Sequence, residues 1–523
     1  MKNYKLKITY TFLAIIGLAV SSCTKDFTEV NTDPIGKSTT SANQLLAPAL
    51  VGVLNTNMVR NWNFNNQLMQ VTVEINDSEG RVFRYDVRRT LADYTWNNWY
   101  LYLTDLKDIY NIASKPESLN KSYQGISLIA QTWVYQLLTD TYGDIPFSQA
   151  NMGKEGNVQP AFDRQKDIYT AMFAQLEQAN QLLKEGTPIV ATSDPVFQGD
   201  VSKWRRFCNS LYLRLLLRVS AKSEVSTSVI AKIKQIVDTN PAEYPIMQDN
   251  THTAKILWNG TNSSTAVYSS PFMVNIRAAD FRGIPICDFF LSKLVSWGDP
   301  RMNGSLGTGN VNRFCIDQAP NGGFVGVPSG YAPGSGVTVL SHFNSDADSN
   351  KPTLQTDRFT GIIMNTAEVD FILAEAAAKG WISGPTEKYY YKGMVDAINY
   401  WLPNYISTPT DSRFIDYITA ADLEWDPTLP LDNTTLGNTS QLEMIHIQKY
   451  YALFLVDMQQ WFEFRRTGHP ILPKGPGLVN NQKMPARLNY PLVTQSTNPT
   501  SYSNAIAIQG PDDINTLMWW QKP

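Results

Sequence analysis

Apolar residues recur at three- and four-residue spacing along much of the chain, which is the period of an amphipathic helix. One stripe comprises Trp96, Trp99, Leu103, Leu106 and Tyr110, and the next comprises Ile126, Ile129, Trp133 and Leu137. These two stripes predict a pair of antiparallel helices. A third stripe runs through Tyr169, Met172 or Phe173, Leu176 and Leu183, and a fourth runs through Trp204, Cys208, Leu211 and Leu215.

Capping residues predict where some helices begin and end. Asp163 is a candidate N-cap for the third helix, and Gly186 suits the position just past its end. Later in the chain, Asn365 and Glu368 form a variant of the capping box for a helix that stops at Gly380.

The segment from Leu442 to Phe464 is apolar and aromatic on most faces. This pattern predicts one long helix buried between others, with Gly468 past its end. No fixed-period repeat is visible in the sequence itself.

Much of the span at about 251–357 lacks a helical period. Gly, Pro, Asn and Ser cluster in Asn303 to Asn312, Ala319 to Gly336 and Ser341 to Pro352. Loops of this length inside a compact protein are usually functional or disordered, and these also contain aromatic residues.

The N-terminus has the pattern of an export signal. Basic residues are followed by an apolar run, Tyr10 to Val20, which is too short to span a bilayer comfortably. The ending Val20-Ser21-Ser22-Cys23 resembles a bacterial lipobox, which implies cleavage before Cys23 and acylation of that cysteine. The alternative is an ordinary secretory signal with an incidental cysteine. We expect a signal peptide at 1–22, a lipidated N-terminus and tether at 23–40, and one helical domain at 41–523.

Composition and charge narrow the function classes. The chain has 523 residues, of which 43% are hydrophobic, and its net charge is −3. These values exclude a disordered or collagen-like chain and give no sign of nucleic-acid binding. Without Cys23, the cysteines Cys208, Cys287 and Cys315 allow at most one disulfide, and the sequence leaves its presence open.

Several blocks, in order along the chain, resemble the SusD/RagB family of outer-membrane nutrient-binding lipoproteins, in particular its SusD-like branch. The blocks are Asn31-Thr32-Asp33-Pro34, LLTDTYGDIPFSQA (137–150), NSLYLRLLLRVS (209–220), DPRM (299–302), AEVDFILAEAAAKGW (367–381), YYYKGMVDAINYW (389–401), QKYYALFLVDMQQWFEFRRTGHP (448–470), MPARLNYP (484–491) and TLMWW (516–520). One departure is Leu492-Val493-Thr494-Gln495, where the family often has a glutamate soon after the Tyr-Pro pair.

The resemblance implies a mainly α fold, in which helix pairs like tetratricopeptide repeats carry the irregular 251–357 region. It also implies a lipoprotein on the outer face of the outer membrane. Such proteins capture oligosaccharides, or sometimes peptides, and close as a lid over a SusC-type TonB-dependent transporter. They are not enzymes.

Sugar binding requires flat apolar faces beside fixed hydrogen-bonding groups, so aromatic residues near Asn, Asp and Arg are the candidates. Two clusters fit, and they could converge in the fold. The first comprises Trp62, Asn76, Asp77, Arg81 and Tyr85, and the second comprises Trp258, Tyr268, Phe324, Tyr331 and Asn344. Aromatic residues on helical stripes, such as Trp99 and Trp133, are expected to pack in the core.

Motifs for metal binding or catalysis are weak. A calcium loop at Asp346, Asp348, Asn350 and Asp357 has suitable oxygen ligands, but Lys351 stands where glycine is needed. The four histidines show no zinc spacing, and no G-x-S-x-G or P-loop motif is present.

The first hypothesis is therefore a surface protein that binds oligosaccharides and delivers them to a transporter. Three alternatives stay open: a peptide- or glycopeptide-binding member of the same family, a glycoside hydrolase using two of the 47 acidic residues, and a scaffold without a ligand.

Overall fold

The computed structural model describes residues 40–261, 268–347 and 351–522. Every described helix and strand lies in one compact unit, Ala42–Pro523. The predicted signal peptide, Cys23 and nearly all of the tether lie outside the described residues.

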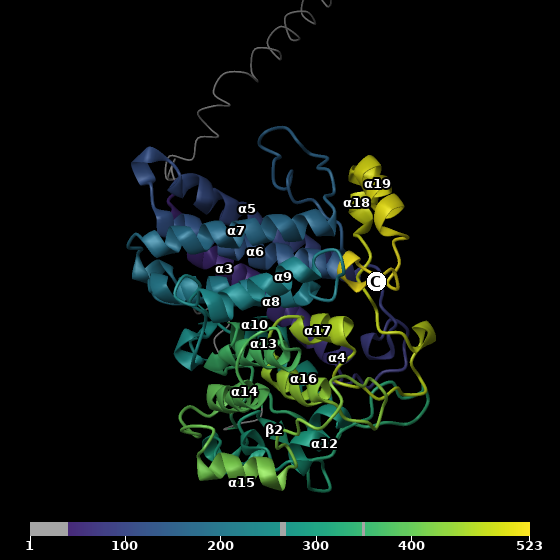
Figure 1. Ribbon diagram of the computed structural model, residues 1–523. Coiled ribbons are helices and arrows are strands. Elements are labelled where there is room, and N and C mark those ends of the chain that lie inside the picture. Colours follow the sequence, from purple (N-terminus) through teal and green to yellow (C-terminus); the bar gives the residue numbers. More distant parts are fainter. Residues whose placement is uncertain (1–39, 262–267, 348–350, 523) are drawn as a thin grey trace, which may run out of the picture. The chain divides into compact units, whose positions relative to one another are not determined.

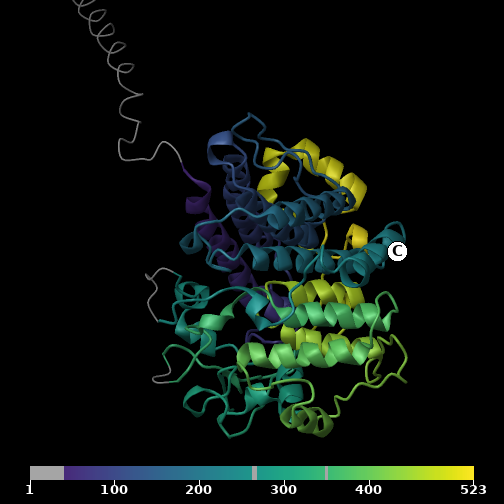
Figure 2. The same cartoon turned by 60° about the vertical axis from the view of Figure 1, so that its left-hand side comes forward.

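The first part of this unit is a stack of helices (Figures 1 and 2). Each long helix packs against the next one along the chain, α3 on α5, α5 on α6, α6 on α7 and α7 on α8. Their bounds are α3 Ala42–Arg60, α4 Asn66–Leu68, α5 Leu91–Ala113, α6 Lys121–Tyr142, α7 Gln165–Glu185, α8 Val201–Val219 and α9 Ser226–Lys234. A π-helical turn, Asn61–Asn65, joins α3 to α4.

The second part contains three short helices and then another packed group, in which α13 contacts α8, α14 and α16. The bounds are α10 Pro271–Asn275, α11 Ala278–Arg282, α12 Asp288–Ser296, α13 Thr366–Ala378, α14 Thr386–Trp401, α15 Ser412–Ala420, α16 Gln441–Ala452, α17 Gln459–Thr467, α18 Leu492–Thr497 and α19 Pro499–Gln509. The fold is thus mainly α with a helix-pair scaffold, as expected. None of the described helices is both long and apolar enough to cross a membrane.

Strands are few and short in the described chain. β1, Ala254–Ile256, pairs antiparallel with β4, Gly361–Met364, and β2, Ile316–Asp317, pairs antiparallel with β3, His342–Phe343. The paired strands β1 and β4 lie at the two ends of the loop-rich span, and β2 and β3 lie within it, as do α10, α11 and α12. The sequence reading missed these three helices because each has at most nine residues and therefore shows little period.

The predicted stripes are the buried faces of the helices. In α5, Trp96, Trp99, Leu103 and Leu106 are all buried, and the Trp99 indole donates to Asn57 Oδ1 at 2.8 Å. In α6, nearly every residue is buried, because this helix lies between α5 and α7. These helices supply a rigid core on which the loops rest.

The predicted cap of α7 is wrong by one residue. Arg164 occupies the N-cap position, and Asp163 instead accepts hydrogen bonds from the backbone N–H groups of Phe147 and Ser148 at 3.0 and 2.9 Å. The carboxylate therefore organises the preceding loop. The C-terminal end is as expected, with Gly186 directly after Glu185. For α13, the Asn365 cap is confirmed, since its side chain accepts from the Glu368 N–H at 2.8 Å.

The single long helix predicted from Leu442 to Phe464 is also wrong. The chain forms α16 and α17, and the residues between them include Leu455 and Asp457 with left-handed backbone angles. The break allows the Asp457 carbonyl to accept a hydrogen bond from Asn61 at 2.7 Å. This contact joins residues that are 396 positions apart in the sequence, so no local pattern predicts it. Gly468 ends α17 in the left-handed region, as expected.

The cysteines Cys208, Cys287 and Cys315 are free and buried. Burial raises the pKa of the Cys287 and Cys315 thiols to about 12. All three buried side chains pack in the core.

Candidate functional site

Two of the predicted segments meet at one place, which we call the loop junction: residues 74–88, after α4, and residues 329–336, in the loop-rich span. The Tyr331 hydroxyl connects them. It donates to the Glu74 carbonyl at 2.8 Å and accepts from the Asn76 N–H at 3.2 Å. Tyr331 is thus the member of the second predicted cluster that hydrogen bonds join to the segment of the first cluster.

Arg84 connects the two segments of the loop junction on their buried side. Its guanidinium lies 4.9 Å from the Phe83 ring centre and 4.7 Å from the Tyr331 ring centre, and the two rings stack at 5.2 Å. The same guanidinium donates to the Tyr331 carbonyl and to Asp77 Oδ1, each at 3.0 Å. Because Arg84 and Tyr331 are buried, this arrangement is a rigid base and not an exposed platform.

The exposed groups of the loop junction are polar. Asn76, Asp77, Ser78 and Glu79 are exposed, and Arg81 is partly exposed. Asp77 accepts from the Gly334 N–H at 3.0 Å, and this bond and the one from Arg84 hold the pKa of its carboxyl below the ordinary value. The Asp77 carboxylate is therefore an ionised hydrogen-bond acceptor at neutral pH.

Arg81 is held beside these groups. Its guanidinium forms an ion pair with Glu74 and donates to Ser78 Oγ. The loop junction therefore offers both donors and acceptors in fixed positions, which is what hydroxyl-rich ligands require.

Other predicted residues lie in the core. Trp62 is 3% exposed and stacks on Phe281 at 4.1 Å, and Trp258 and Asn344 are fully buried. Tyr85 is 4% exposed, and burial raises its pKa to about 12. None of these four side chains presents a face to solvent, so the description of them as ligand-contacting residues is corrected to packing. The sequence pattern gave a wrong prediction for these residues, because aromatic residues next to Asn also occur where a loop covers a hydrophobic core.

The last two predicted residues, Tyr268 and Phe324, are half-buried. Tyr268 lines a cavity of about 450 Å³, together with Lys255 and Arg358. In the described chain, no hydrogen bond, ion pair or ring contact joins either side chain to the loop junction. Their roles in ligand binding stay predictions.

The predicted calcium loop is partly outside the described residues, since Asp348 and Asn350 are not described. Within the described part, the backbone N–H of Asp346 donates to Gln355 Oε1 at 2.8 Å. The Asp357 carboxylate forms an ion pair with Arg313. A carboxylate that is already paired with a guanidinium is a poor calcium ligand.

A buried group in the core has the spacing of a metal site. Ligand atoms of Glu375, His446 and Glu463 lie within 4.8 Å of one another. Arg466 donates to both carboxylates at 2.6–2.7 Å, and Lys449 donates to Glu463 at 2.7 Å. Although burial opposes ionisation, Arg466 holds the pKa of both carboxyls well below the ordinary value. Arg466 and Lys449 therefore already neutralise the two carboxylates that a metal ion would otherwise neutralise.

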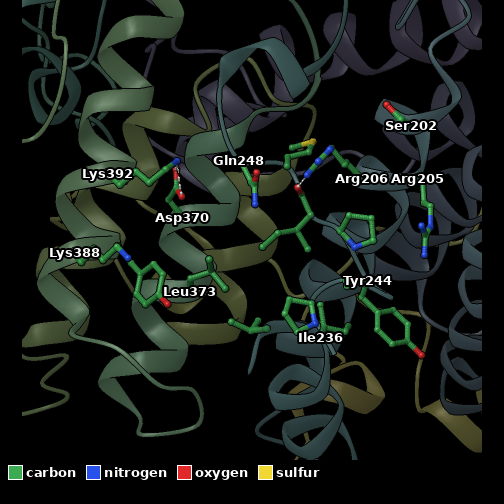
Figure 3. A pocket seen from close by; sticks show the side chains of 17 residues that line it. Ser202, Arg205, Arg206, Ile236, Tyr244, Gln248, Asp370, Leu373, Lys388 and Lys392 are labelled. Atoms are coloured by element: carbon green, nitrogen blue, oxygen red, sulfur yellow. Dashed lines mark hydrogen bonds and ion pairs between the residues drawn. The ribbon is translucent and has the colours of Figure 1, made fainter. Parts of the chain in front are cut away.

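A larger cavity, of about 730 Å³, lies between α8, residues 236–248 and the pair α13–α14 (Figure 3). Arg205, Arg206, Lys388 and Lys392 line it, with Asp370 as the one acid among the described lining residues. Lys392 contacts both Asp370 oxygens at 3.0 Å. The sequence reading missed this cationic cavity because its residues come from separate parts of the chain and show no pattern along it.

A family model matches most of the chain. The model, described as SusD-like and "Starch-binding associating with outer membrane", matches residues 34–491. The chain belongs to the SusD/RagB family. A comparison with curated proteins gives no match.

Solved structures of SusD homologues share the fold. One from Bacteroides fragilis is 22% identical with a TM-score of 0.70, and it covers 92% of this chain and 100% of its own. A chitin-binding SusD homologue from Flavobacterium johnsoniae is 20% identical with a TM-score of 0.68, covering 92% and 98%. A SusD-like protein from Bacteroides thetaiotaomicron is 21% identical with a TM-score of 0.67, also covering 92% and 98%.

Proposed function

We propose that this protein binds oligosaccharides at the outer membrane, with the loop junction as its recognition surface. The observation that carries the proposal is the row of exposed polar groups at residues 76–79, which Arg84 and Tyr331 hold in fixed positions. Preorganised donors and acceptors lose little entropy on binding, and that property favours ligands with many hydroxyl groups.

The family supports this function. Its model is described as starch-binding and associated with the outer membrane, and one structural neighbour is described as chitin-binding. The proposal for this chain names no particular glycan. The exposed residues at the loop junction are known only as hydrogen-bond donors and acceptors, and all glycans carry hydroxyl groups that suit such residues.

Each exposed group has a proposed role. Asp77 accepts hydrogen bonds from sugar hydroxyls, Arg81 donates to them, and the Asn76 amide does both. The backbone N–H of Asn76 donates to the Tyr331 hydroxyl, and Tyr331 positions Asn76 in this way. Tyr331 does not contact the ligand itself. Tyr268 and Phe324 are proposed as outlying contacts for a longer oligosaccharide.

Delivery is the second part of the proposal. The protein is anchored by acyl chains on Cys23, faces the cell exterior, and passes its ligand to a SusC-type TonB-dependent transporter. Two or three buried acyl chains hold a protein on a membrane essentially permanently, since each CH₂ contributes about 0.8 kcal/mol. The protein binds its ligand without cleaving it.

Calorimetry tests the proposal on the acyl-free protein that begins at Thr24. The titrants are malto-, cello-, xylo- and chito-oligosaccharides, with an acidic peptide as a separate arm. We expect saturable binding of at least one oligosaccharide, weakened about tenfold by Arg81→Ala, because a hydrogen bond to a charged group contributes about 1.5–3 kcal/mol.

Arg277→Ala is the matched control, since Arg277 is exposed and also forms an ion pair, with Asp280, outside the loop junction. Equal weakening by both substitutions would contradict a role for the loop junction. Binding of the peptide alone would replace the oligosaccharide with a peptide as ligand. Shortened oligosaccharides after incubation, detected by chromatography, would instead indicate a glycoside hydrolase.

A further inference from the structure

The cationic cavity has the size of a ligand site and basic residues on two facing walls. Its volume of about 730 Å³ lies within the range of about 300–1,000 Å³ that is typical of ligand pockets, which is room for a disaccharide. Figure 3 shows Arg205 and Arg206 of α8 on one side, and Lys388 and Lys392 of α14 on the other. Residues of the segment 236–248 complete the lining.

Most of the positive charge in the cavity is not compensated. Lys392 is neutralised, because its ammonium lies 3.0 Å from Asp370 Oδ2 and 2.7 Å from Asp396 Oδ2. The other three basic residues form no ion pair in the described part of the chain. These three are Arg205, Arg206 and Lys388.

Acidic residues next to the lining have other partners. The Glu243 carboxylate pairs with Lys184 at 2.5 Å, and the Asp238 carboxylate accepts from the Ser383 N–H at 2.9 Å. Neither acid lines the cavity. An anion in the cavity would therefore meet uncompensated positive charge, which attracts it over several ångströms.

The two arginines are held in place by hydrogen bonds to backbone and amide oxygens. Arg205 donates to the Glu243 carbonyl at 2.6 Å and to Asn180 Oδ1 at 2.9 Å. Arg206 donates through Nη1 to the Ile246 carbonyl at 2.9 Å. An anion would not have to order these side chains when it binds.

These bonds leave donors that a ligand can reach. Within the described chain, Arg205 Nη1 and Arg206 Nη2 form no hydrogen bond, and both atoms are accessible to solvent. The Lys388 ammonium is also without a hydrogen bond there, on an exposed residue. A guanidinium fork matches the paired oxygens of a carboxylate or a sulfate. The free donors of the cavity are thus suited to an oxyanion.

The rest of the lining is largely apolar. It includes Pro241, Pro245 and Leu373, together with the rings of Tyr244 and Tyr389. Such surfaces bind the C–H faces of a pyranose. An inorganic ion would use the cations alone and leave this apolar surface uncovered, whereas a sugar that carries an acidic group uses both parts.

We propose that the cationic cavity binds an acidic sugar, with its anionic group between the two arginines of α8 and Lys388 of α14. The proposal rests on the oligosaccharide-binding function proposed above, and it adds a ligand class at a place that shares no residue with the loop junction. Uronic acids and sulfated sugars offer the same charge-assisted hydrogen bonds, so the experiment has an arm for each.

Microscale thermophoresis of the chain beginning at Thr24 tests the proposal. The acidic ligands are digalacturonate and galactose 6-sulfate, and their neutral counterparts are the dimethyl ester of digalacturonate and galactose. Tetraglutamate is a separate arm for an acidic peptide. We expect saturable binding of at least one acidic sugar, at least tenfold tighter than that of its neutral counterpart, because the counterpart lacks the charge that the cations attract.

Two variants remove positive charge from opposite walls. Lys388→Glu is the main one, because Lys388 is exposed and its side chain bonds to nothing in the described chain, so the fold does not depend on it. Arg206→Gln is the second. Lys115→Glu is the matched control, since Lys115 is likewise exposed, forms no ion pair in the described chain and does not line the cavity.

We expect Lys388→Glu and Arg206→Gln each to weaken binding of the acidic sugar at least tenfold, and Lys115→Glu to change it less than twofold. Equal affinities of Lys388→Glu and Lys115→Glu would overturn the site, and so would the absence of binding by the wild type. Binding of tetraglutamate without either acidic sugar would overturn the assignment to a sugar. Failure of the oligosaccharide-binding function shows separately, in the calorimetry with neutral oligosaccharides and Arg81→Ala.

Discussion

At the scale of single residues, Arg84 illustrates how a buried charge organises exposed groups. It is 4% exposed, yet its hydrogen bonds reach the exposed Asp77 and the backbone of Tyr331. Its guanidinium also lies on two aromatic rings, an arrangement that contributes about 2 kcal/mol or more when desolvated. One side chain thus fixes both halves of the loop junction.

Tyr331 gives a prediction about stability. Tyr331→Phe removes a hydroxyl that bonds to Glu74 and Asn76, so we expect a loss of about 1 kcal/mol in the free energy of unfolding. Tyr331→Ala also removes the stacked ring, and the expected loss is about 3–5 kcal/mol. Denaturant unfolding measures both. A Tyr331→Ala protein within about 0.5 kcal/mol of the wild type would contradict the structural role of this ring.

His469 gives a prediction about pH. Its ring nitrogens lie 2.6 Å from Glu443 Oε2 and 2.8 Å from Asp432 Oδ1. Burial alone would lower the pKa, but these two hydrogen bonds raise it above the ordinary value of 6.5. The charged form is therefore favoured in the folded state. Its contribution to stability is complete below about pH 6.5 and is lost as the pH rises through the raised folded value.

Unfolding of the wild type and of His469→Gln, compared at about pH 6 and about pH 8, checks this sign. We expect the wild type to lose part of its advantage over the variant at the higher pH. The neighbouring His446, 5.8 Å away, is common to both proteins, and its pKa is lowered by burial. An advantage that grew with pH would contradict the assignment.

At the scale of elements, helix ends follow local chemistry. Asp200 caps α8 through hydrogen bonds from the Ser202 and Lys203 N–H groups at 3.0 and 3.2 Å. We expect Asp200→Ala to cost about 1 kcal/mol in the free energy of unfolding, and Asp200→Ser to restore most of it, because serine is also a good N-cap. Thermal unfolding at neutral pH measures the difference. Equal values for the alanine and serine variants would show that the cap contributes nothing.

The break between α16 and α17 has a different origin. No glycine or proline stands between Ala452 and Gln459, and the sequence there is as apolar as the helices on either side. At this turn the Asp457 carbonyl accepts a hydrogen bond from Asn61, which lies near the other end of the chain. Burial also raises the pKa of the Asp457 carboxyl to about 6. Local pattern predicts that a segment is helical, whereas tertiary contacts decide whether it is interrupted.

At the scale of the whole molecule, the sequence predicted most of the scaffold. Long helices such as α5, α6 and α8 have clear stripes of apolar residues. The three- and four-residue spacing of these stripes was enough to predict where the helices lie. The family followed from ordered blocks of residues, which the match to residues 34–491 confirms. Short helices within the loop-rich span did not follow, since five to nine residues carry too little pattern.

The candidate site was predicted only in part. The segments that meet at the loop junction were identified, because exposed Asn, Asp and Arg residues next to aromatic residues are visible in sequence. The sequence does not show which aromatic rings are exposed, and Trp62 and Trp258, which it predicts as ligand contacts, pack in the core. The cationic cavity was not predicted, since it joins segments that are distant in sequence.

The most direct test of the central claim is hydrogen–deuterium exchange of the acyl-free protein, with and without the oligosaccharide that binds most tightly in calorimetry. The account predicts slower exchange in peptides that cover residues 74–81 and 329–336 at the loop junction. Protection confined to residues 236–248, which line the cationic cavity, with no change at the loop junction, would contradict it.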